Sequence, residues 1–146
     1  MTDAQFVHAY DVVGGDFTNA GRASTGIKET LKQMGLPSPL IRRVAIAAYE
    51  AEMNTVMYAR RGTMTLRVTP SEVVIDACDE GPGIPDIELA MEEGYSTATA
   101  EMREMGFGAG MGLPNIKRNT DEFIITSDVH QGTTLVMKVH VHASDG

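Results

Sequence analysis

Apolar residues recur at every third or fourth position in two segments near the start of the chain, the spacing of one face of an α-helix. The first segment covers about 17–34, with Asp16 before it as an N-cap and Gly35 after it as a C-cap. The second runs from about 40 to 59, and Pro39 stands where proline suits the first helical turn. The pattern therefore predicts two consecutive helices.

Alternation of apolar and polar residues, which is typical of half-buried strands, dominates most of the remaining chain. The predicted strands cover residues 5–13, 63–69, 73–78, 123–127 and 134–141, and short helices are expected at 87–93 and 111–118. Asp79 shares its parity with Val73 and Ile75, so it should lie at the end of its strand on the face of those apolar side chains.

The predicted order is strand, helix, helix, strand, strand, short helix, helix, strand, strand. Helices and hairpins are thus grouped rather than alternating one for one. This favours an α+β fold, a two-layer α/β sandwich with helices packed on one face of a mixed β-sheet, over a doubly wound parallel sheet. For a chain of this length, we expect residues 1–146 to form a single domain.

Composition narrows the classes of partner. The net charge of −8 argues against nucleic-acid binding, which normally needs a basic stripe. No apolar run is long enough to cross a membrane, and the N-terminal residues lack the basic and apolar regions of a signal peptide. Cys78 is the only cysteine, which excludes a disulfide framework. These features predict a cytoplasmic protein without a membrane or nucleic-acid partner.

Four short motifs carry the candidate chemistry, and none of them is specific alone. Glycines let backbone N–H groups approach a ligand, and a glycine loop leading into a helix is a natural anion site. The P-loop motif and the H-R-D kinase set are both absent from the sequence. The four motifs are Glu50-x-x-x-Asn54 on a helix, Asp79-x-Gly81-x-Gly83 after a strand, Gly108-x-Gly110-x-Gly112-Leu113 before a helix, and Gly132-Thr133-Thr134 at the last strand.

In this order and at these spacings, the motifs resemble the boxes of the GHKL superfamily of ATP-binding domains (the Bergerat fold), with an ATP lid expected at about 92–110. Within it the chain is similar to the small anti-sigma-factor serine/threonine kinases, in particular to stressosome switch kinases of the RsbT type. Tyr58 supports this subgroup, because sigma-sequestering members usually carry histidine there. The segment 98–107 is longer than in those kinases.

The resemblance implies a role for several motif residues at the base of the nucleotide. Asp79 would accept a hydrogen bond from the adenine amino group. Thr133 would contact adenine directly or through water. Gly81 and Gly83 would let the chain pass close to the base.

At the phosphates, the resemblance implies ATP bound with Mg²⁺. Asn54 would offer the metal a neutral oxygen ligand, the kind of donor that Mg²⁺ prefers. Glu50, one helical turn earlier, would take a proton from an incoming hydroxyl. The remaining cofactor-binding residues form the glycine box that would present amides to the phosphates: Gly108, Gly110, Gly112 and Leu113.

These roles describe an ATP- and Mg²⁺-dependent serine/threonine protein kinase. Its expected substrate is a STAS-domain anti-sigma-factor antagonist or stressosome protein, in partner-switching regulation of stress or sporulation signalling. The alternative is a non-catalytic, ATP-loaded binding switch that sequesters a sigma factor or activates a phosphatase, and a simple ATPase is a third reading. A homodimer is compatible with all three.

Other polar side chains are assigned structural roles. Glu52 is expected to be a surface charge, and Cys78 is expected to pack within its strand. His140 and His142 share one strand face, but the sequence offers no third ligand beside them, so a solvated face is favoured over a zinc site.

Overall fold

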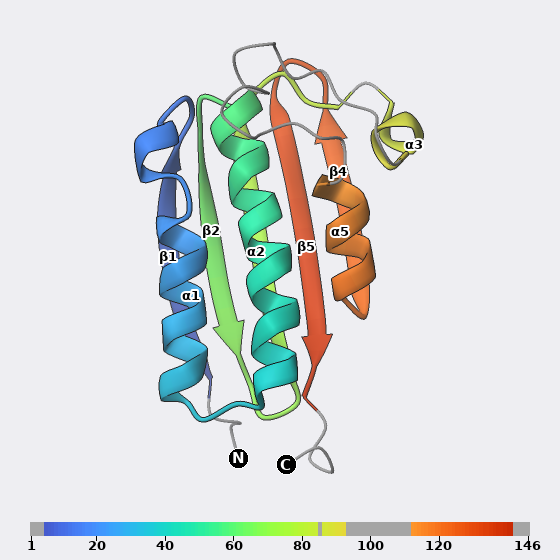
Figure 1. The fold of residues 1–146 in the computed structure, drawn as a ribbon. Coiled ribbons are helices and arrows are strands. Elements are labelled where there is room, and N and C mark those ends of the chain that lie inside the picture. Colours follow the sequence, from blue (N-terminus) through green and yellow to red (C-terminus); the bar gives the residue numbers. More distant parts are fainter. Residues whose placement is uncertain (1–4, 85, 93–111, 142–146) are drawn as a thin grey trace.

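Five strands form one sheet, and the helices cover one of its faces (Figure 1). The structure is a computed structural model that describes residues 5–84, 86–92 and 112–141. Its elements are β1 (Phe6–Val13), the 3₁₀ turn η1 (Phe17–Asn19), α1 (Arg22–Gln33), α2 (Ser38–Tyr58), β2 (Arg61–Val68), β3 (Glu72–Glu80), α3 (Ile87–Ala90), α5 (Gly112–Asn119), β4 (Glu122–Asp128) and β5 (Gly132–His140). The predicted two-layer α+β class is confirmed.

The sheet order is β1-β2-β3-β5-β4, and every neighbouring pair among the described strands is antiparallel. The expectation of a mixed sheet was therefore wrong. Two helices separate β1 from β2 and carry the chain along the sheet and back, so β2 starts at the end where β1 stops (Figure 1). β3 and β4 do point the same way, but β5 lies between them.

The core lies between the sheet and the helices. Alternate residues of the central strands face it, as the two-residue period of a strand requires. The largest fully buried side chains are Ile27, Leu31, Val44, Val56, Met64, Leu66, Val73, Ile75, Ile116 and Met137. Cys78 is exposed rather than packed, because its parity is opposite to that of Ile75 and it lies on the other face of the sheet.

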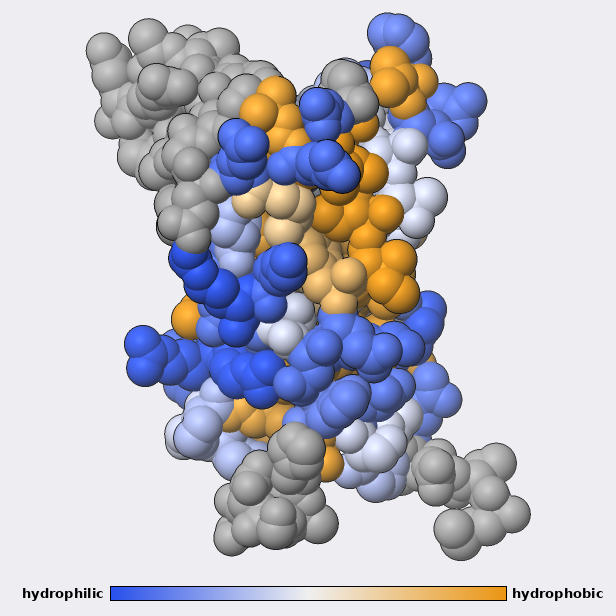
Figure 2. All heavy atoms as spheres, turned by 90° about the vertical axis from the view of Figure 1, so that its right-hand side faces the viewer, coloured by the Kyte–Doolittle hydropathy of each residue, from blue (hydrophilic) through white to orange (hydrophobic). Residues whose placement is uncertain are grey.

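β4 forms one edge of the sheet. Figure 2 faces this edge and shows hydrophobic residues along its upper part, above a band of hydrophilic residues. Two side chains near this edge, Ile124 and Val129, are 53% and 48% exposed. The neighbouring helix α5 packs chiefly against α2 rather than against β4, so α2 is the element that positions α5.

The first predicted helix, over 17–34, is interrupted near its start. Asp16 caps only the 3₁₀ turn, where its Oδ1 accepts a hydrogen bond from the backbone N–H of Asn19 at 3.3 Å. Gly21 then adopts a left-handed φ of +101°, which a right-handed helix of L-residues does not contain, and α1 begins at the next residue. The C-cap is Met34 rather than Gly35, and Gly35 follows it with a left-handed φ of +75°, the usual place of a helix-ending glycine.

Glu52 lies inside the protein, so its assignment as a surface charge was wrong. Its side chain accepts hydrogen bonds from the backbone N–H groups of Gly21, Ala23 and Ser24, at 2.9, 3.2 and 2.9 Å. These groups belong to the start of α1, where N–H donors lack intrahelical partners and where the helix dipole favours a negative charge. α2 therefore supplies the N-terminal cap of α1.

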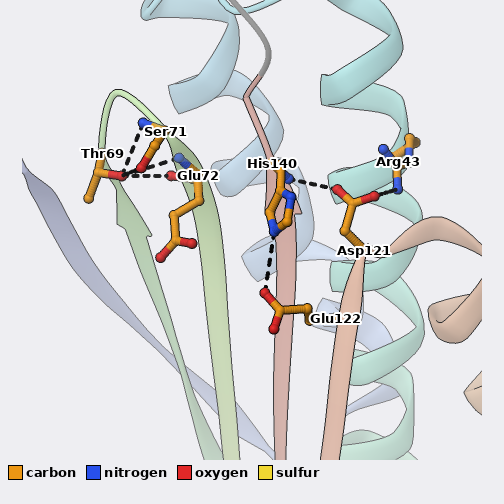
Figure 3. A network of polar contacts seen from close by, with 7 residues as sticks. All are labelled: Arg43, Thr69, Ser71, Glu72, Asp121, Glu122 and His140. Carbon is orange, nitrogen blue, oxygen red and sulfur yellow. Dashed lines mark hydrogen bonds and ion pairs between the residues drawn. The ribbon is translucent and has the colours of Figure 1, made fainter.

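A polar network ties α2 to the sheet at the end where β5 stops (Figure 3). The carboxylate of Asp121 accepts hydrogen bonds from Nη2 of Arg43 at 3.1 Å and from the backbone N–H of His140 at 2.7 Å. The bond from His140 is the main cause that lowers the pKa of Asp121, with a smaller contribution from Arg43, while partial burial acts in the opposite direction.

His140 has an acidic neighbour rather than a metal-binding group around it. Its ring Nε2 lies 3.3 Å from Oε2 of Glu122 (Figure 3). No cluster of three metal-binding side chains occurs within the described ranges, and His142 lies outside them.

Of the helices that the structure describes, none is both long and apolar enough to cross a membrane.

Candidate functional site

The predicted site residues that the structure describes lie toward one end of the sheet, where α2 and β3 end and where β5 and α5 begin (Figure 1). The chain that follows β3 packs here against the end of α2. A Cβ atom on Gly81 would lie only 3.0 Å from the Cα atom of Ala59. The chain after β3 therefore contacts α2 five residues beyond Asn54, so two motifs that are far apart in the sequence lie toward the same end of the molecule.

Asp79 is half-buried at the end of β3, on the core-facing side that its parity predicted. Its Oδ1 accepts a hydrogen bond from the backbone N–H of Thr133 at 3.0 Å. Burial raises the pKa of Asp79, and the N–H group of Thr133 partly opposes that rise. The structure thus joins two of the sequence-predicted residues directly, and it holds a carboxylate in a partly desolvated position.

Ser127 belongs to the same cluster, and the sequence analysis missed it. Its Oγ lies 3.0 Å from Oγ1 of Thr133 and accepts a hydrogen bond from the backbone N–H of Ile84 at 2.7 Å. The hydroxyl therefore links β4, β5 and the loop after β3. The signal was available: Ser127 has the parity of Phe123 and Ile125, so it is a polar residue at a core-facing position.

The glycines of this loop have a packing reason in the described structure. Gly83 has a φ of +78°, and a Cβ atom there would lie 2.5 Å from the backbone oxygen of Asp128. A Cβ atom on Gly132 would lie 1.9 Å from the backbone oxygen of Asp79. These contacts close the loop after β3 against the β4–β5 turn. The approach of Gly81 and Gly83 to a nucleotide base stays a prediction.

Glu50 is half-buried on α2 and has a direct partner on α5. Its Oε2 accepts a hydrogen bond from Nδ2 of Asn115 at 2.6 Å. Asn54 is also half-buried, one helical turn beyond Glu50 on the same face of α2. Sequence reasoning assigned no role to Asn115, because nothing in the local pattern shows that α5 will pack beside this part of α2.

The glycine box is described only from Gly112 onwards, since Gly108 and Gly110 lie outside the described residues. Gly112 is the first residue of α5. Leu113 is buried, and its side chain belongs to the core, so a ligand could meet only its backbone. The phosphate-binding role of this box stays a prediction.

The donor types at this end of the sheet suit a nucleotide bound with a divalent cation. A half-buried carboxylate, Asp79, can accept a hydrogen bond from an exocyclic amino group. Asn54 offers an oxygen atom, the kind of ligand that Mg²⁺ takes in proteins, and the carboxylate of Glu50 lies one helical turn away to accept a proton. The residues present therefore fit both groups.

Residues 16–139 match the family described as "Histidine kinase-like ATPase domain". The chain is similar to "Serine/threonine-protein kinase RsbT" of Bacillus subtilis (strain 168), at 33% identity over 112 residues that cover 74% of this chain and 78% of the relative. It is also similar to "Anti-sigma F factor" of Caldanaerobacter subterraneus subsp. tengcongensis, at 31% identity over 111 residues that cover 70% of this chain and 74% of the relative. The factor of the same name from Geobacillus kaustophilus is 32% identical over 101 residues, which cover 65% of this chain and 66% of the relative.

Proposed function

From the membership of this chain in the family of histidine kinase-like ATPase domains, which its motifs indicated, we propose a function. The protein is a cytoplasmic, ATP- and Mg²⁺-dependent serine/threonine protein kinase. Its proposed substrate is a STAS-domain protein, an anti-sigma-factor antagonist or stressosome component, in a partner-switching system. The similarity to a protein named as a serine/threonine kinase supports this proposal. The single observation that carries phosphate transfer over ATP binding alone is the half-buried carboxylate of Glu50, which accepts a hydrogen bond from Asn115 on α5.

In the proposed complex, Asp79 and Thr133 bind the adenine. One oxygen of Asp79 is engaged by the N–H group of Thr133, and a carboxylate has further lone pairs with which to accept the adenine amino group. Ser127 supports this subsite by holding the Thr133 hydroxyl and the loop after β3 together. The subsite therefore selects a base with a hydrogen-bond donor at this position.

In the proposed transfer step, Glu50 accepts the proton of the substrate hydroxyl. The hydroxyl oxygen forms a bond to the γ-phosphorus, the bond from that phosphorus to the β–γ bridging oxygen breaks, and ADP leaves. Asn115 holds the Glu50 carboxylate in place through its 2.6 Å hydrogen bond. Mg²⁺, held in part by Asn54, would offset phosphate charge that a protein with a net charge of −8 does not neutralise by itself.

The decisive experiment measures transfer of labelled γ-phosphate from Mg·ATP to a STAS-domain protein. Glu50→Gln should lower the rate at least 100-fold, as loss of a general base commonly does, while the affinity for ATP stays near the wild-type value. Glu122→Gln, the same change at an exposed carboxylate near the other end of the sheet, is the matched control. If Glu50→Gln transfers phosphate at the wild-type rate, Glu50 is not the base.

The second candidate function is the non-catalytic binding switch, and the similarity to proteins named anti-sigma F factor favours it. Such a switch would bind ATP through the same residues but would sequester a sigma factor or activate a phosphatase. The transfer assay separates the two functions. ATP binding that depends on Asp79, together with no phosphate on the STAS-domain protein, would support the switch over the kinase.

A further inference from the structure

A groove of about 690 Å³ runs along α1 and α2. Its described lining comes entirely from these two helices, which lie side by side on the sheet (Figure 1). The lining residues are Lys28, Lys32, Ser38, Ile41, Arg42, Ala45, Ile46, Tyr49 and Glu50. The groove is distinct from the cluster around Asp79, yet it includes the proposed catalytic carboxylate Glu50.

The charge of the groove is opposite to that of the whole protein. Lys28 and Lys32, one turn apart on α1, and Arg42 on α2 contribute three cations, whereas Glu50 is the one acidic residue in the described lining. Lys32 has an acidic neighbour in Glu29, at 3.8 Å, but both side chains are more than half exposed, so this pair is weak. On a protein with a net charge of −8, the groove is therefore a local basic surface.

The floor of the groove is apolar. Ala45 and Ile46 on α2 are half-buried, and Tyr49, four and three residues further along the helix, is 43% exposed, whereas Ile41 is buried in the core. A partly exposed apolar floor with a basic rim is complementary to an amphipathic helix whose apolar stripe is flanked by acidic residues. From Ser38 to Glu50 the lining spans about 18 Å of α2, at 1.5 Å for each residue, which matches three turns of a partner helix.

We propose that the α1–α2 groove docks an acidic amphipathic helix of the protein substrate. This proposal rests on the proposed kinase function and adds the surface by which the substrate is recognised. The apolar stripe of the docked helix lies on Ala45, Ile46 and Tyr49, and its carboxylates face Lys28, Lys32 and Arg42. The groove reaches Glu50, so docking brings the substrate protein to the carboxylate that accepts the hydroxyl proton.

The test uses a triple variant, Lys28→Gln/Lys32→Gln/Arg42→Gln, with the STAS-domain protein of the transfer assay as the probe. We expect its KM for that protein to rise about tenfold, because three charge pairs across the interface are lost. The affinity for ATP and kcat at saturating substrate should stay near the wild-type values. A charge-conserving control, Lys28→Arg/Lys32→Arg, and a control on the other face of the sheet, Lys138→Gln, should both keep the wild-type KM.

Direct binding separates this proposal from the proposed function. Fluorescence anisotropy of the labelled STAS-domain protein, with a non-hydrolysable ATP analogue present, measures docking without chemistry. If the wild-type chain transfers no phosphate, the kinase proposal fails, and the anisotropy comparison still decides the groove. Equal affinity of the triple variant and the wild type overturns the docking proposal. Loss of nucleotide affinity in the triple variant also overturns it, because the groove would then serve ATP.

Salt dependence gives an independent readout of the same interface. Exposed charge pairs are screened as the ionic strength rises, so added salt should weaken wild-type docking. The triple variant has lost those pairs, and its residual affinity should change less. An identical salt dependence of the two proteins contradicts an acidic partner surface.

Discussion

Glu52→Gln tests the structural role of a buried carboxylate that lies two residues from the proposed catalytic one. Glu52 is 2% exposed, and its two oxygens accept three backbone N–H groups from the start of α1. Oε2 serves Gly21 and Ala23, and Oε1 serves Ser24. A glutamine side chain has one acceptor oxygen, so its amide NH₂ group must face at least one of these donors.

The expected loss of stability follows from this geometry. Keeping the oxygen at the Oε2 position preserves two bonds and leaves the N–H group of Ser24 without an acceptor, which costs about 1–3 kcal/mol in a buried position. Removing the negative charge from the helix N-terminus adds about 0.5–1 kcal/mol. We therefore expect Glu52→Gln to lower the free energy of unfolding by about 1.5–4 kcal/mol, a large part of the stability of an ordinary domain.

Urea denaturation followed by far-UV circular dichroism measures this loss. Hydrogen exchange of the three capped amides locates it, and their protection should fall more than that of the core strands. Glu50→Gln is the matched control on the same helix. Glu50 is only half-buried, and its one described side-chain hydrogen bond is to Asn115, so the loss should be about 1 kcal/mol or less.

The pair of variants should therefore separate stability from activity. Glu52→Gln should lose stability but retain phosphate transfer at temperatures where it is folded. Glu50→Gln should keep most of its stability but lose phosphate transfer. An unchanged urea midpoint for Glu52→Gln would refute the capping argument. Equal destabilisation by both changes would also refute it, because the loss would then follow from removing any glutamate charge on α2.

Two further changes test the sheet carboxylates. The pKa of Asp79 is raised in the folded protein, so its stabilising contribution is present below the unfolded pKa and is lost as the pH rises through the folded value. Asp79→Asn should therefore raise the urea midpoint of the ligand-free protein at neutral pH, and this gain in stability should disappear in acid. The same change should weaken ATP binding, as calorimetry would measure. The pKa of Asp121 is lowered, so its contribution is present above the unfolded pKa and is lost as the pH falls through the folded value. Asp121→Asn should lower the stability at neutral pH by about 1 kcal/mol, given its partly exposed site, and the difference from the wild type should shrink below about pH 4, as denaturation across a pH series would show. A pH-independent difference for either variant contradicts the assigned cause.

The contrast between Glu50 and Glu52 shows where local sequence patterns stop being informative. Both glutamates lie on α2, and the motif spacing singled out Glu50 together with Asn54. Glu52 was assigned to the surface by its charge, although it follows Ile41 by three helical turns on the apolar stripe. The reason for a buried charge at that position is the start of α1, which no pattern within α2 reveals.

The sequence by itself determined the features that depend on neighbours along the chain. Strand parity placed Asp79 on the core-facing side of β3, helical periodicity predicted α2 within two residues at each end, and glycine chemistry predicted that the first helix ends just before Gly35. These are local rules of backbone geometry, so they can be read in one short segment.

Only the tertiary structure decided which distant residues meet. It paired Glu50 with Asn115, 65 positions away, and Asp79 with Thr133, 54 positions away. It also made the sheet antiparallel, because two packed helices return the chain to the end of the sheet that it had left. Such contacts depend on how whole elements pack against one another, and burial then decides whether a carboxylate is a solvated charge, a helix cap or part of the candidate site.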